Sequence, residues 1–146
     1  MFDVFVAEMQ CPNCEKALSV TADTGMQTYI RSDPDGSMLG IGYTFDPREL
    51  TTKSLIGASY ALIAEPPPGG PIRLLNTWSC PACQTEQWAM VTISDRRIQK
   101  IEPVAMNRAT FEAANFITDV DADLLARRFQ DPLTESNVEV LRRHLT

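Results

Sequence analysis

The chain has 146 residues, with 13 Lys and Arg against 19 Asp and Glu, which gives a net charge of −6. This length is typical of one domain, and a hydrophobic content of 44% is enough for a buried core. The negative charge disfavours nucleic acid or an anionic membrane surface as a partner, because phosphate groups are repelled at long range.

The sequence also predicts a cytoplasmic location. The first residues lack the basic region and apolar stretch of a signal peptide. The longest apolar-leaning run, residues 55–64, is interrupted by Gly57 and Ser59 and is too short to cross a bilayer. In a reducing compartment, four cysteines indicate metal binding more often than disulfides.

The first 45 residues read as β-structure. Residues 2–9 and 16–22 are expected to form strands on either side of Cys11-Pro12-Asn13-Cys14. Residues 26–45 are expected to form a hairpin whose turn is Asp33-Pro34-Asp35-Gly36, because proline presets one backbone angle and glycine accepts a positive one.

The middle of the chain predicts a helix and a connector. Asp46-Pro47-Arg48-Glu49 has the capping-box pattern of a helix start. The helix is expected to continue to about Ala64, and the competing interpretation is a strand over residues 59–64. Residues 66–71 contain four prolines and two glycines, which predicts an extended surface loop.

Strands and then helices follow. Residues 72–79 and 86–93 are expected to be strands around Cys80-Pro81-Ala82-Cys83, with a third strand returning through residues 98–104. A helix capped by Asn107 or Thr110 is expected to bury Phe111, Ala114 and Phe116-Ile117. Further helices are expected after Asp119 and after Thr134–Asn137, with a break at Asp131-Pro132 between them.

The two Cys-Pro-x-Cys motifs contain all four cysteines of the chain. Zinc is held tetrahedrally by four thiolates at about 2.3 Å, and each motif supplies two thiolates from one tight turn. The 65 residues between Cys14 and Cys80 exceed the roughly 12–20 of common zinc-site patterns. The sequence predicts one structural zinc per chain, and the long spacer also allows two chains to contribute one motif each. The predicted ligands are Cys11, Cys14, Cys80 and Cys83.

No catalytic constellation is visible. With His144 as the single histidine, histidine-based triads and the usual catalytic zinc sets are excluded. A four-thiolate site also has no open position for water. The sequence therefore favours a non-enzymatic protein, without deciding the point, and we assign no catalytic or cofactor-binding residue besides the metal ligands.

Three alternatives to a structural zinc protein stay open. Cys-x-x-Cys is also a dithiol redox motif, four thiolates also hold iron, and some zinc ribbons bind nucleic acid. Trp78 and Trp88 flank the second motif. They are expected to shield the sulfurs and pack the sheet, and the alternative is a recognition surface.

The two knuckles between strand-like segments resemble the zinc-ribbon and rubredoxin-like group, and the small bacterial proteins with paired Cys-Pro-x-Cys motifs. The resemblance covers residues 5–20 and 74–93 and implies that all four cysteines ligate metal. Many members carry glycine directly after the second cysteine of a knuckle, where this chain has Glu15 and Gln84.

Together these observations predict an α+β fold with a zinc-ribbon-like antiparallel β core. Residues 1–105 are expected to form the ribbon-like domain, with a hairpin and helix inserted at about residues 24–70. Residues 106–146 are expected to form a helical extension packed on the core or on a partner. The predicted function is that of an accessory or regulatory subunit that binds another protein or itself.

Overall fold

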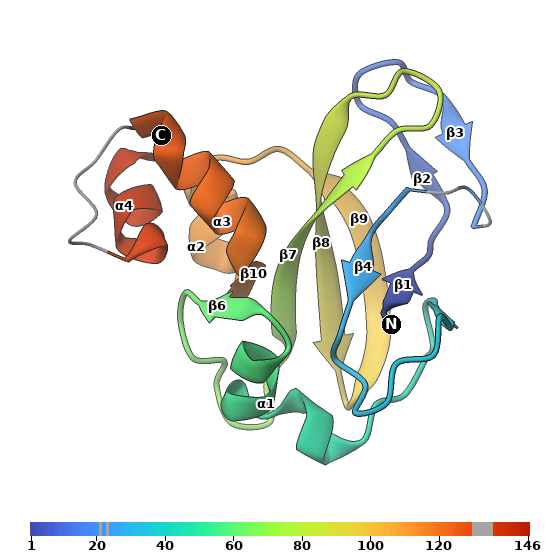
Figure 1. The fold of residues 1–146 in the computed structure, drawn as a ribbon, viewed down its shortest axis with the longest axis vertical. Helices are drawn as coiled ribbons and strands as arrows, with labels where there is room; N and C mark the ends of the chain where they lie inside the picture. The colour runs from blue at the N-terminus through green and yellow to red at the C-terminus, as the bar shows by residue number, and fades with distance from the viewer. Residues whose placement is uncertain (21, 23, 130–135) are drawn as a thin grey trace.

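The structure is a computed structural model that describes residues 1–20, 22, 24–129 and 136–146. It is an α+β fold, as predicted. A central five-stranded sheet lies between an N-terminal β layer and a group of C-terminal helices, as Figure 1 shows.

The five-stranded sheet has the order β6-β10-β7-β8-β9. Its centre is an antiparallel meander of three long strands, which confirms the three strands predicted here. The turn between β8 and β9 is tight, because Asp95 and Arg96 both have positive φ, at 54° and 63°. The strands are β6 (Tyr60–Leu62), β7 (Ile72–Ser79), β8 (Glu86–Ser94), β9 (Arg97–Val104) and β10 (Phe116–Thr118).

Both faces of this sheet are buried, so side chains alternate between two cores. Leu74 packs in the core of the N-terminal layer, while the next residue, Leu75, packs among the helices. Phe116 and Ile117 divide in the same way. The helices on the second face are α2 (Arg108–Ala113), α3 (Asp119–Ala126), η2 (Arg127–Phe129) and α4 (Asn137–His144).

The N-terminal layer contains a three-stranded sheet in which β1 (Asp3–Phe5) lies between β4 (Gln27–Thr28) and β5 (Met38–Leu39). β1 is antiparallel to β4 and parallel to β5. The predicted hairpin of residues 26–45 is therefore wrong. Its two arms bond to β1 instead of to each other, because the N-terminal strand occupies the place between them.

A buried carboxylate fixes the loop that joins these arms. Asp3 is fully buried, and its side chain accepts a hydrogen bond from Arg31 Nε at 2.9 Å. The backbone N–H groups of Asp35 and Ser37 donate to the same carboxylate at 3.2 and 3.0 Å. This arrangement could not be predicted from a local pattern, since Asp3 lies about thirty residues from its partners.

The middle segment confirms the capping box and corrects the helix length. Asp46 and Glu49 cap η1 (Pro47–Leu50), and α1 (Thr52–Gly57) follows. The helix ends at Gly57 instead of continuing to Ala64. The competing strand is confirmed as β6, which is held in register by β10.

The C-terminal segment is less helical than expected at one place. Asn107 caps α2, as predicted, but residues 116–118 form β10 between β6 and β7 instead of continuing a helix. Phe116 and Ile117 point into different cores, and this alternation of side chains requires a strand at residues 116–118. The predicted break at Asp131-Pro132 and helix opening at Thr134–Glu135 lie outside the described residues, whereas Ser136 caps α4.

Candidate metal centre

The N-terminal knuckle (residues 11–16) joins β2 (Met9–Gln10) to β3 (Ala17–Leu18), which are shorter than the strands predicted around it. Two backbone hydrogen bonds close the turn. The Cys11 N–H donates to Lys16 O at 3.0 Å, and the Glu15 N–H donates to Cys11 O at 2.8 Å.

The C-terminal knuckle (residues 80–85) has the same hydrogen bonds at the ends of β7 and β8. The Cys80 N–H donates to Thr85 O at 3.1 Å, and the Gln84 N–H donates to Cys80 O at 2.7 Å. The strand registers match as well, because Gln10 faces Ala17 as Ser79 faces Glu86. The two knuckles therefore match in backbone detail.

Both knuckles turn through a left-handed residue that is not glycine. Glu15 has φ 63° and Gln84 has φ 60°. A side chain in this region costs about 1–2 kcal/mol, so the turn retains the geometry that glycine would adopt without this cost. The absence of glycine at these two positions does not change the shape of the turn.

The knuckles meet at the top of the molecule in Figure 1 and bring the four predicted ligands together. Cys11 Sγ lies 3.8 Å from Cys83 Sγ, and Cys14 Sγ lies 3.7 Å from Cys80 Sγ. All four sulfurs lie within 4.8 Å of one another, and all four are free thiols. A tetrahedron with zinc–sulfur bonds of about 2.3 Å has edges of about 3.8 Å, so the sulfurs suit a four-coordinate metal.

The cluster is anchored on its inner side and accessible on its outer side. Cys11 and Cys80 are buried in the core of the N-terminal layer, whereas Cys14 is exposed. Trp78 belongs to the same core and is buried, and its Nε1 donates to Trp88 O at 3.1 Å. Trp78 thus shares one core with the first cysteine of each knuckle, whereas Trp88 packs against the core on the helical face of the sheet.

Asn13 and Thr85 are site residues that the sequence analysis missed. Asn13 Nδ2 reaches across from the first knuckle and donates to Cys83 Sγ at 3.4 Å and to Thr85 Oγ1 at 3.0 Å. The Thr85 hydroxyl, followed by the Asn13 amide, lowers the pKa of the Cys83 thiol to about 6. A local sequence pattern could not predict the contact between Asn13 and Thr85, because 72 positions separate them.

The neighbouring thiols oppose the ionisation of Cys14. The Lys16 backbone N–H lowers the pKa of Cys14, but desolvation and the three neighbouring thiols together raise it to about 11. Several thiolates at such short range repel one another unless a cation compensates their charge. A divalent metal supplies that charge, and thiolate sulfur is a ligand that zinc prefers.

No protein-family model, curated protein or solved structure matches this chain. Among the described helices, none is both long enough and apolar enough to cross a membrane. The four-cysteine cluster, which can hold a metal ion, is thus the clearest chemical feature of the protein.

Proposed function

We propose that Cys11, Cys14, Cys80 and Cys83 bind one zinc ion per chain, and that the ion holds the fold together without taking part in a reaction. The observation that carries the proposal is that four sulfurs from two matching knuckles lie within 4.8 Å of one another. Four thiolates fill the coordination sphere of zinc and leave no position for a substrate or water.

Metal identity and stoichiometry test this proposal together. Elemental analysis combined with native mass measurement should give one zinc per chain. Visible absorbance from iron–thiolate bonds would instead support a rubredoxin-like redox protein, and a sample that binds no metal would contradict both. One metal per two chains would show that half of the knuckles hold no metal, and it would contradict the proposed stoichiometry.

We further propose that the protein acts as an accessory or regulatory subunit by binding another protein. Support comes from the three-stranded sheet, where apolar side chains are exposed on β5 and directly beside the ends of β1 and β4. The Phe2 and Tyr29 rings are in edge-on contact at 6.4 Å, and Met38 is 64% exposed. Exposed apolar groups on neighbouring strands are typical of interaction surfaces.

A pair of charge substitutions tests this surface. Met38→Glu should abolish binding of a protein partner, or self-association measured by sedimentation equilibrium. Leu124→Glu is the matched control, because Leu124 is similarly exposed but lies on α3, on the other side of the central sheet. Equal behaviour of the two variants and the parent chain would contradict the proposed surface.

A further inference from the structure

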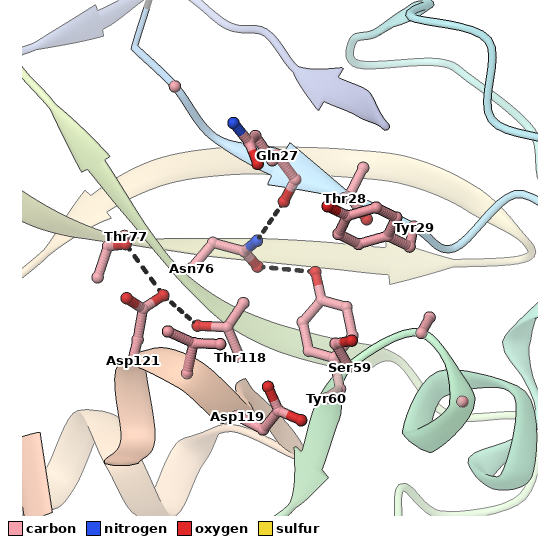
Figure 2. A pocket seen from close by; sticks show the side chains of 14 residues that line it. Gln27, Thr28, Tyr29, Ser59, Tyr60, Asn76, Thr77, Thr118, Asp119 and Asp121 are labelled. Carbon is pink, nitrogen blue, oxygen red and sulfur yellow. Dashed lines mark hydrogen bonds between the residues drawn. The ribbon is translucent and has the colours of Figure 1, made fainter. Parts of the chain in front are cut away.

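A second candidate site lies away from the cysteines, where the three layers of the molecule meet. It is a cavity of about 610 Å³, a size typical of small-molecule sites. Its walls come from β4, from the turn between α1 and β6, from β7 and from the start of α3, as Figure 2 shows. It is open to a small molecule and independent of the proposed metal function.

The inner wall carries buried polar groups. Tyr60 and Asn76 are both almost completely buried, and the Tyr60 hydroxyl donates to Asn76 Oδ1 at 3.0 Å. Thr28 is 2% exposed, and its hydroxyl has no hydrogen bond of normal geometry to a described residue, although it lies close enough to the Tyr60 hydroxyl to offset part of the rise that burial causes in the pKa of Tyr60. Burying a hydroxyl without a well-formed hydrogen bond costs stability, so this wall has hydrogen-bonding capacity that the fold itself does not use fully.

The other wall is acidic. Asp119 and Asp121 line the cavity from the first turn of α3. Asp121 Oδ2 accepts hydrogen bonds from the hydroxyls of Thr77 and Thr118, which fix this carboxylate in place. No Lys, Arg or His is among the described residues that line the cavity, and no ion pair joins either aspartate to a described basic group.

These charges decide what kind of ligand fits. The positive end of a helix is equivalent to about half an elementary charge, which two carboxylates more than offset. The cavity therefore repels anions and attracts cations. Tyr29 and Tyr60 are also among the residues that line it, and an aromatic ring attracts an ammonium or guanidinium group that lies over its face.

We propose that this cavity binds a small organic cation, an amine or guanidinium compound that also exchanges hydrogen bonds with the buried wall. Its cationic group pairs with Asp119 and Asp121, and a polar group at the other end reaches the hydroxyl of Thr28. The volume suits a free molecule, and a single Lys or Arg side chain of another protein would fill only part of it.

Binding can be tested on the metal-loaded full chain by calorimetry and by amide chemical shifts. Agmatine and 1,5-diaminopentane are the cationic probes, and 1,5-pentanediol and glutarate are the neutral and anionic controls of similar length. The cations should bind and shift the amides of residues 27–29, 60 and 119–121, and both controls should fail. Failure of both cations, or equal binding of the diol, would overturn the proposal.

A Gly-Arg-Gly peptide separates the two sources of a guanidinium group. It should bind more weakly than agmatine, because its backbone cannot enter the cavity. Binding as tight as that of agmatine would assign the site to a side chain of another protein and overturn the small-molecule proposal.

Two substitutions on α3 test which carboxylate contributes to agmatine binding. Asp119→Asn should weaken agmatine binding by about tenfold or more, since it removes one carboxylate from the cavity. Asp123→Asn is the matched control, because Asp123 pairs with Arg127 outside the cavity. Equal losses in the two variants would show a general field effect and no site.

Thr28→Val separates a binding role from a structural one. The substitution keeps the shape of the side chain and removes the hydroxyl that has no well-formed hydrogen bond. The melting temperature should stay the same or rise, while agmatine binding weakens severalfold. Unchanged binding, or lower stability with no specific loss of binding, would contradict the role of this hydroxyl.

Discussion

The two knuckles share one backbone geometry but stand on very different supports. The C-terminal knuckle ends a ladder of eight paired positions between β7 and β8. The N-terminal knuckle rests on β2 and β3, which pair at only two positions. The two turns can thus differ in how much they depend on the metal. Long-range sheet pairing holds one turn in place, whereas the other relies on two paired positions and on the burial of Met9, Cys11 and Leu18.

Metal removal should produce the largest effect and should act unequally on the two knuckles. Structural zinc contributes about 10–16 kcal/mol in small peptides, and part of that amount should remain in this larger core. Chelation, Cys11→Ser or Cys80→Ser should lower the melting temperature strongly. Amide exchange should rise at residues 10–18 well before it rises at residues 74–91.

Zinc re-addition is the control for chelation and should restore protection. Equal amide exchange in both knuckles after metal loss would show that the short strands are as stable as the long ones. It would contradict the stronger dependence of the N-terminal knuckle on the metal. Unchanged melting in both serine variants would contradict a structural role for the metal.

Asp3→Ala should give the next largest effect, because this carboxylate holds the N-terminal layer by polar contacts instead of a long ladder. The substitution leaves Arg31 and the N–H groups of Asp35 and Ser37 without their buried acceptor. A loss of about 3 kcal/mol in unfolding free energy is expected in denaturant titrations. Asp33→Ala, in the same loop, is the control and should stay within about 0.5 kcal/mol.

Asn13→Ala should have a moderate effect that is specific to one knuckle. The Asn13 amide crosses to Cys83 and Thr85, whereas the equivalent residue of the other knuckle is Ala82, which has no such group. The unfolding free energy should fall by about 1 kcal/mol, and Ala82→Ser should leave it nearly unchanged. Similar losses of unfolding free energy in both variants would mean that the hydrogen bonds of the Asn13 amide make no specific contribution to stability.

Glycine at the left-handed positions should have the smallest effect and the same sign in both knuckles. Glu15→Gly and Gln84→Gly remove backbone strain, and the larger freedom of glycine in the unfolded chain offsets part of the gain. Each should raise the unfolding free energy by roughly 0.5 kcal/mol in denaturant titrations. Opposite signs at the two positions would show that the two turns are not equivalent.

Local signals were sufficient for several elements. The capping box at Asp46 and Glu49, the cap at Asn107 and the long strands on either side of the second motif all depend on neighbouring residues. The four ligand positions could also be selected from the sequence, because two Cys-Pro-x-Cys motifs with no further cysteine have few other interpretations.

Non-local contacts decided the rest. Residues 26–45 do not form the predicted hairpin, because both of its arms pair with β1. Residues 116–118 form a strand between β6 and β7. In both places the hydrogen-bond partner lies far away in the chain, so hydrophobic periodicity cannot identify it.

The sequence by itself determined which residues can ligate a metal and the overall α+β class, since thiol chemistry and strand-length patterns are local properties. Only the tertiary structure decided that the central sheet is buried on both faces, that Asn13 reaches Cys83, and that Thr28 meets Asp119 and Asp121 around one cavity. These arrangements depend on which layers pack together, and layer packing follows from the sum of many distant contacts.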